Sequence, residues 1–275
     1  MINFENCPVT LTQNAGVFDG GSVSLFSPSI SINESSSLDN LPALGLMGIS
    51  GVYPSEPPNG TVNLDFYITG SENASPFLNL RKYIYERDED NFIDITVGPY
   101  EIEDAVLTDY EISANVNDII TARASFNYYG QLATSTVPDQ DVLSGSMVHS
   151  YISNGDFSDL GFSASPFSFN YAFSQSYEIF RTIANPLVDV ALFTDGSETA
   201  SIDGYGLPTG IVDTTRSSSS TAWYVPKTGG FNFELKNTCG EKLAEIGITG
   251  EFSDRSAAVN DGEVVNGSIE IIKQL

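Results

Sequence analysis

The densest group of residues that could do chemistry is a run of carboxylates: Glu86, Asp88, Glu89, Asp90 and Asp94. Carboxylate oxygens are the ligands that Ca²⁺ prefers in proteins. The run lacks the mid-loop glycine and the terminal bidentate glutamate of an EF-hand, and it follows a predicted helix. We therefore interpret it as a solvated loop, with a Ca²⁺ site as the alternative.

Nucleophilic, redox and phosphate chemistry have little support in this chain. The single histidine, His149, lies in a segment that we predict to connect two domains, and no nucleophile motif surrounds it. A Gly-x-Ser-x-Gly elbow, a glycine-rich phosphate loop and His/Cys metal spacing are all missing from the sequence. Cys7 and Cys239 do not form a disulfide framework and are predicted to be free thiols, with a bridge between them as the alternative. We predict no catalytic, cofactor-binding or metal-binding residues, and no enzyme.

Aromatic pairs offer a different chemistry, because tyrosine and tryptophan rings on a β-sandwich can stack against sugars. The same residue types are also favoured strand residues and pack at subunit interfaces, which is the reading we prefer. The chain starts without the basic and apolar regions of a secretion signal, which a polysaccharide-binding module usually needs. The candidate pairs are Tyr83/Tyr85, Tyr128-Tyr129 and Trp223-Tyr224.

The net charge of −25 constrains the partners of this protein. Residues 1–140 carry 4 basic and 19 acidic side chains, net −15, and residues 141–275 carry 7 and 17, net −10, so the acidity belongs to both halves. So negative a surface repels nucleic acid. Solubility in a salty habitat would explain the charge, and so would a channel wall along which DNA slides without sticking. No apolar run approaches the roughly 20 residues that span a bilayer.

The elements that position these side chains are predicted to be mostly strands. Alternating runs bounded by Gly, Pro, Asn and Asp indicate antiparallel sheets with one buried face. A helix is predicted over residues 76–87 and a further helical turn over 177–183. Turns are predicted at Gly70, Gly98-Pro99, Asp195-Gly196 and Asp261-Gly262. The predicted strands cover residues 22–32, 62–68, 92–97, 121–128, 188–193 and 268–272.

The sequence contains weak internal repeats in a constant order, which predicts the same β-domain twice. Ser27-Pro28 returns as Ser165-Pro166, and residues 64–67 return as 202–205, both 138 residues later. Residues 116–118 return as 259–261 and 125–126 as 268–269, 143 residues later. Phe126 and Ile269 are expected at matching inward positions, each after an Asn-Asp turn. We predict a first β-domain at residues 1–135, a connector at 136–160 and a second β-domain at 161–275.

One part of the sequence resembles a known family, the phage tail tube proteins. Residues 106–118 read Val-Leu-Thr-Asp-Tyr-Glu-Ile-Ser-Ala-Asn-Val-Asn-Asp and precede a run that ends in Tyr128-Tyr129-Gly130. This is similar to the family's tyrosine-containing strand, Asn-Asp turn and closing strand, and residues 22–32 are similar to its start. The duplication resembles siphophage tube subunits with two tube domains in one chain. The second copy departs from the pattern at residues 251–255.

The resemblance implies a mainly β chain of two tandem antiparallel barrel or sandwich domains, each with a short flanking helix. It implies a virion structural protein of the phage tail, made in the host cytoplasm, with no cofactor. Trimeric rings with pseudo-sixfold symmetry would stack into a tube that contacts other tail proteins and conducts genomic DNA without specific binding. The alternatives are another virion part (a tail terminator, neck or capsid decoration protein) or a carbohydrate-binding or adhesin module.

Overall fold

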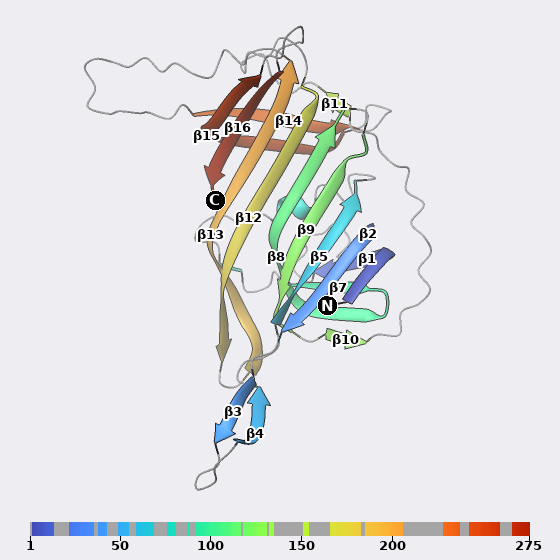
Figure 1. Cartoon of the computed structure of the whole chain (residues 1–275), viewed down its shortest axis with the longest axis vertical. Coiled ribbons are helices and arrows are strands. Elements are labelled where there is room, and N and C mark those ends of the chain that lie inside the picture. Colours follow the sequence, from blue (N-terminus) through green and yellow to red (C-terminus); the bar gives the residue numbers. More distant parts are fainter. Residues whose placement is uncertain are drawn as a thin grey trace, which may run out of the picture.

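The described residues fold almost entirely into antiparallel strands (Figure 1). The computed structural model describes residues 2–13, 22–35, 38–42, 49–54, 59–68, 76–80, 87–88, 92–116, 118–130, 132–134, 151–153, 166–182, 185–205, 228–236, 242–258 and 266–275. The strands are β1 (Ile2–Gln13), β2 (Ser22–Ser35), β3 (Leu38–Pro42), β4 (Ile49–Pro54), β5 (Asn59–Tyr67), β6 (Arg87–Asp88), β7 (Ile93–Val97), β8 (Tyr100–Asn115), β9 (Thr121–Tyr128), β10 (Leu132–Thr134), β11 (Tyr151–Ser153), β12 (Ser168–Thr182), β13 (Asn185–Tyr205), β14 (Thr228–Lys236), β15 (Lys242–Ala258) and β16 (Asn266–Gln274).

The first half of the chain forms a closed six-stranded antiparallel barrel. Its strands follow the order β1-β7-β8-β9-β5-β2, and β2 pairs with β1 to close the circle. Closure pairs the strand edges that would otherwise invite edge-to-edge association. β3 and β4 form a separate hairpin, as Figure 1 shows.

Alternation of apolar and polar residues explains these strands, because successive side chains in a strand point to opposite faces. In β9 exposed or half-buried residues alternate with buried ones along the whole strand. In β2 the buried positions switch phase, from Val23 and Leu25 before Pro28 to Ile30 and Ile32 after it. The Ser27 hydroxyl stabilises this bend by donating to the carbonyl oxygens of Ser29, at 2.8 Å, and Asp65, at 2.5 Å.

The second half repeats the strand order of the first. Its order is β11-β14-β15-β16-β13-β12. When the six strands of each half are numbered one to six in chain order, both halves have the spatial order one, four, five, six, three, two. All five neighbouring pairs are again antiparallel. The second half stays open where the first closes, because β12 pairs with β8 rather than with β11, the counterpart of β1.

Strand β8 joins the two halves. Along one edge its residues 100–105 pair with β7 inside the barrel, while residues 109–115 pair with β12. The sheet therefore runs without interruption from β5 through β9, β8, β12 and β13 to β16, as Figure 1 shows.

The two halves also share one hydrophobic core. The rings of Phe77 and Tyr110 stack with centroids 5.1 Å apart, and Tyr110 packs 5.6 Å from Phe173 of β12. In the second half Phe169 stacks on Phe233 at 3.7 Å. The aromatic contacts thus continue from the barrel interior into the second sheet, and the proposed boundaries at residues 135 and 161 remain a prediction.

Buried polar groups reinforce the junction. The Gln175 amide of β12 donates to the carbonyl oxygens of Leu107, at 3.1 Å, and Leu80, at 3.4 Å. In this way a second-half strand holds both β8 and the helical turn that precedes β6. Pairing of such amides is required in a core, because an unpartnered buried polar group costs free energy.

The helix predictions were wrong in part. The predicted helix over 76–87 is a single turn at residues 76–79, and Arg87 lies in strand β6, while residues 81–86 are outside the described part. The helical turn predicted over 177–183 is also wrong, because residues 177–182 belong to β12 and pair with β13. Local apolar spacing indicated a helix there, but the long-range pairing with β13 decides the conformation. No described residue of the second half is helical.

The turn predictions had mixed outcomes. Gly98-Pro99 does form the turn between β7 and β8. Asp195-Gly196 does not turn: it lies inside β13, next to a bulge that shifts the register between Ser176 and Tyr177 of β12. Thr194 is the additional residue of β13 at this bulge. Gly196 therefore lies beside an irregularity in strand pairing and not in a chain-reversing turn. Gly70 and residues 261–262 are outside the described part.

The register corrects the residue-level repeat. Phe126 and Ile269 are both buried in late strands, as predicted. Leu64 pairs with Ala124, whereas Ile202, the predicted counterpart of Leu64, pairs with Ile269. The position equivalent to Phe126 is therefore Ile271, two residues further on and on the same face. Because side chains in a strand alternate with a period of two, the pattern of buried residues looks the same after a shift of two residues.

Candidate functional site

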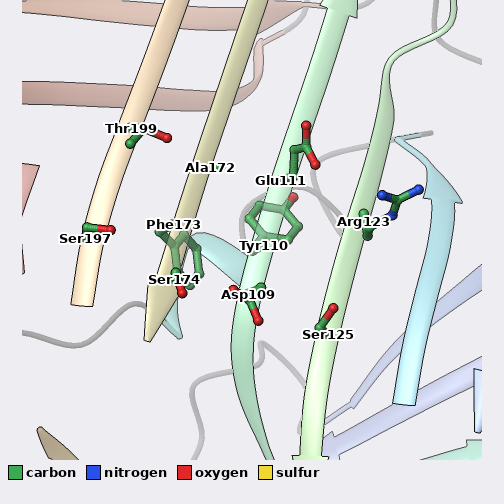
Figure 2. A pocket seen from close by; sticks show the side chains of 10 residues that line it. All are labelled: Asp109, Tyr110, Glu111, Arg123, Ser125, Ala172, Phe173, Ser174, Ser197 and Thr199. Carbon is green, nitrogen blue, oxygen red and sulfur yellow. The ribbon is translucent and has the colours of Figure 1, made fainter. Parts of the chain in front are cut away.

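A polar sheet surface crosses both halves of the molecule, and we call it the polar face. Cross-strand pairing aligns its residues in two rows over β5, β9, β8, β12 and β13. One row is Asp65, Arg123, Glu111, Ala172 and Thr199, and the other is Asn63, Ser125, Asp109, Ser174 and Ser197. Figure 2 shows the four strands from β9 to β13 with these side chains.

Each strand of the polar face has its apolar side chains on the opposite side. Leu64, Ala124, Tyr110 and Phe173 alternate with the polar residues and are buried in the core. The polar side chains are therefore placed by the same alternation that builds the core. The face continues onto β16, where Glu270 pairs with Ser201 of β13.

Hydrogen bonds between neighbouring strands fix these side chains. The Arg123 guanidinium donates to the Asp65 carboxylate at 2.7 Å, and the Asn170 amide donates to the Glu111 carboxylate at 2.9 Å. The Ser125 hydroxyl donates to the Asn63 amide oxygen at 2.9 Å. Hydrogen bonds between the strands thus hold these polar side chains in place.

The electrostatic balance of the polar face is negative. The two rows contain the acids Asp65, Asp109 and Glu111 and the single cation Arg123, so their net charge is −2. The hydrogen bond and charge of Asp65, together with the charge of Glu111, raise the pKa of Arg123. Arg123 is therefore held by acids on both neighbouring strands and adds little positive potential of its own.

Two depressions lie on the polar face. One, of about 190 Å³, lies over β8, β9, β12 and β13 (Figure 2). The other, of about 320 Å³, lies over β5, β9 and β8, between Pro28 and Ser113. The first is lined by hydroxyl groups, carboxylates and the Arg123 guanidinium, and also by Tyr110, Ala172 and Phe173. Within the described ranges no three His, Cys, Asp or Glu side chains are placed to hold a metal ion.

The residues singled out from the sequence do not gather here. Most of the 86–94 carboxylate run lies outside the described residues; Asp88 is in β6, and Asp94 is in β7, where its carboxylate accepts a hydrogen bond from the Asp104 amide at 3.4 Å. His149 and Cys239 are also outside, while Cys7 has a free, half-buried thiol whose pKa is raised by burial.

The aromatic pairs give no exposed platform among the described residues. Tyr128 is fully buried, with its ring against the backbone near Gly60, so the Tyr128-Tyr129 pair cannot present two rings to a sugar. Tyr83, Tyr85 and residues 223–224 lie outside the described part.

Asp118 of the predicted Asn117-Asp118 turn lies in the turn before β9, and Asn117 is outside the described residues. The amide of Asp118 donates to the Asn115 carbonyl oxygen at 3.2 Å, and the Asp118 carboxylate accepts from the Ile119 amide at 2.8 Å. Asp118 therefore serves the turn chemistry that the sequence predicts. The corresponding residues 260–261 are not described.

Sequence reasoning missed the polar face itself. Asp65, Glu111 and Arg123 are far apart in the sequence and match no motif. The available signal was that nearly every outward position of the predicted strands is a small polar or acidic residue, but only the register shows that they form continuous rows.

No protein-family model matches this chain, and no curated protein matches it. No helix in the described part is both long enough and apolar enough to cross a membrane.

Proposed function

We propose that this protein is a structural subunit of a bacteriophage virion, namely the major tail tube protein. The observation that carries the proposal is the polar face: one negatively charged, hydroxyl-rich surface that continues through both halves of the chain. We assign this face to the wall of a channel that conducts DNA.

The physical argument concerns DNA phosphates. Duplex DNA carries one charge per roughly 1.7 Å, and proteins that hold it supply Lys and Arg to its phosphates. A wall with three acids and one neutralised arginine in its two central rows repels phosphates instead. Short hydroxyl and amide side chains leave the wall smooth and hydrated, so DNA slides past it.

The repeated strand order supports the assembly. Two units with the same topology in one chain supply two pseudo-equivalent positions to a ring. Three subunits then give six, and we propose a trimeric ring with pseudo-sixfold symmetry that stacks into a tube. The tandem tube-like domains at residues 1–135 and 161–275 are part of this proposal.

The decisive experiment is negative-stain microscopy of the purified full-length protein, concentrated at moderate salt. Salt is needed because a chain of net charge −25 repels its copies over a Debye length of about 10 Å at 0.1 M. Hollow filaments of six-lobed rings are expected. Discrete trimers would indicate a capsid decoration role instead, and monomers at every concentration would contradict the proposal and make a glycan-binding screen the next experiment.

A further inference from the structure

Exposed apolar side chains lie at the two ends of the long strands that carry the polar face. Among the described residues the large hydrophobic side chains that are exposed are Val116, Phe180 and Tyr205, at 50%, 44% and 43%. Tyr205 ends β13 and Val116 follows β8, whereas Phe180 lies near the opposite end of β12. In Figure 1 these are the upper and lower ends of the same long strands.

The upper group is held rigidly by the sheet, and we call it the head patch: Val116, Phe167 and Tyr205. The Val116 amide donates to the Phe167 carbonyl oxygen at 2.9 Å, and the Phe167 amide donates to that of Asp203 at 2.9 Å. The rings of Phe167 and Tyr205 lie 5.0 Å apart. Val116, Phe167 and Tyr205 thus lie at the neighbouring ends of three strands, and the Phe167 and Tyr205 rings are in contact.

The lower end is formed by two long strands, and we call it the arm: residues 177–182 of β12 and 185–193 of β13, with the short β6 paired to Ala191 and Leu192 of β13. Pairing between β12 and β8 ends at Ser174, and within the described part of the chain residues 177–182 of β12 pair with β13. Ser174, Ser176, Glu178 and Phe180 are exposed in alternation, so Phe180 extends from the same side of β12 as the polar face. It stands opposite Val190, which is half-buried.

We propose that copies of this chain stack end to end, with Phe180 of one copy packed against the head patch of the next. The two surfaces lie at opposite ends of the same pair of strands, so a shift along the strands brings one onto the other. An interface between two different surfaces of the same chain is heterologous and propagates without limit. Stacking in this direction hides the exposed apolar groups and joins successive polar faces into one wall.

The geometry sets the scale of the repeat. From Val190, opposite Phe180, to Tyr205, β13 advances 15 residues, which corresponds to about 50 Å at roughly 3.3 Å per residue. Because strands tilted from the stacking axis shorten this distance, the axial spacing between copies is expected to be at most about 50 Å. This inference rests on the proposed tube function, for which it names the surface between successive rings.

The first test substitutes the apolar groups singly, as Phe180→Ser and Tyr205→Ser, with Glu178→Ser as the matched control on the same exposed side of the arm. Thermal melting checks that each variant folds. Losing one buried aromatic contact per interface should raise the protein concentration needed for filaments about tenfold or more and leave isolated rings. The control should assemble like wild type. Filaments from Phe180→Ser at the wild-type concentration would overturn the stacking surface and leave the tube function standing.

The second test distinguishes this contact from a failure of the tube function. In a Cys7→Ser, Cys239→Ser background, the double variant Phe180→Cys, Tyr205→Cys should form a ladder of disulfide-linked multimers on oxidation. Each single variant should stay monomeric on a non-reducing gel, because a heterologous contact never brings two copies of one residue together. Dimers from Phe180→Cys alone, or no ladder from the double variant, would overturn the inference even if wild type forms no tubes.

Discussion

The Lys273 ammonium of β16 lies 3.0 Å from the Glu198 carboxylate of β13, whose side chain is fully buried. The Tyr171 hydroxyl donates to the same carboxylate at 2.6 Å, so one buried acid ties three strands of the second half together. Lys273 itself is 31% exposed. Removing Lys273 and removing Glu198 should therefore have different effects on stability.

Lys273→Met should destabilise the protein by about 3 kcal/mol, since it leaves a buried carboxylate without its cation. Glu198→Gln should cost only about 1 kcal/mol, because the lysine can turn into water and the amide oxygen can still accept from Tyr171. Urea denaturation midpoints measure both, and the double variant should recover most of the Lys273→Met loss. Equal losses from the two single variants would contradict this account.

The shared core predicts cooperative unfolding of both halves. Phe77 and Phe169 are both buried, at 0% and 1% exposure, in one hydrophobic core. Phe77→Ala in the barrel and Phe169→Ala in the second sheet should each cost about 3–5 kcal/mol and shift the same single unfolding transition. Far-ultraviolet circular dichroism would follow the strands of both halves through the transition. Two separate transitions, each moved by only one variant, would show instead that the halves unfold independently.

Replacing Asp104 with a neutral residue is predicted to stabilise the protein. Burial raises the pKa of its carboxyl, and the charges of Asp94 and Glu103 raise it further. A folded-state pKa above the unfolded value means that the folded state loses stability as pH rises through that range, and the cost is fully present at neutral pH. Asp104→Asn should therefore stabilise the protein at pH 7 by a few tenths to about 1 kcal/mol.

The gain from Asp104→Asn should shrink at acidic pH, where the aspartate is protonated in both states. Asp104→Ala serves as the control, because residue 104 has φ of 56°, a left-handed conformation that Asn tolerates better than Ala. Thermal melting at two pH values measures the difference. A gain that stays constant with pH would rule out the electrostatic explanation.

Two glycines provide a matched pair for testing strand packing. A Cβ at Gly60 would lie 2.2 Å from the Asn33 carbonyl oxygen and 2.4 Å from the Tyr128 ring, whereas one at Gly247 meets nothing closer than 3.6 Å. Gly60→Ala should lose about 1–3 kcal/mol through overpacking. Gly247→Ala should be neutral or slightly stabilising. Chemical denaturation of both would check this, and similar values would mean that the barrel adapts at Gly60.

The assignment of the polar face to a channel wall predicts an effect of charge on DNA passage. Asp109→Lys with Glu111→Lys should leave ring assembly possible but make assembled tubes retain DNA, with a salt dependence that steepens by about 0.9 per phosphate contacted. Virions that carry these tubes should eject their genome several-fold more slowly. Asp109→Asn with Glu111→Gln is the control that removes charge without reversing it. Normal ejection through a verified lysine-lined tube would reject the sliding argument.

The sequence by itself determined the class of fold and the inward residues. Alternation in β2, β5, β9 and β16 is local, so it identifies strands and places Phe126 and Ile269 in the core without any partner strand. The Asn-Asp turn before β9 was equally predictable, since an Asp side chain bonds its own neighbouring backbone.

Only the tertiary structure decided which strands meet and in what register. Residues 177–182 are a strand and not a helical turn because β13 pairs with them, and Asp195-Gly196 continues a strand because a bulge absorbs the irregularity. Pairing of β1 with β2 closes the barrel, whereas in the described part of the second half β12 pairs with β8 and not with β11. Asp65, Arg123 and Glu111 become one surface for the same reason: cross-strand pairs join residues distant in sequence, and local periodicity carries no information about that pairing.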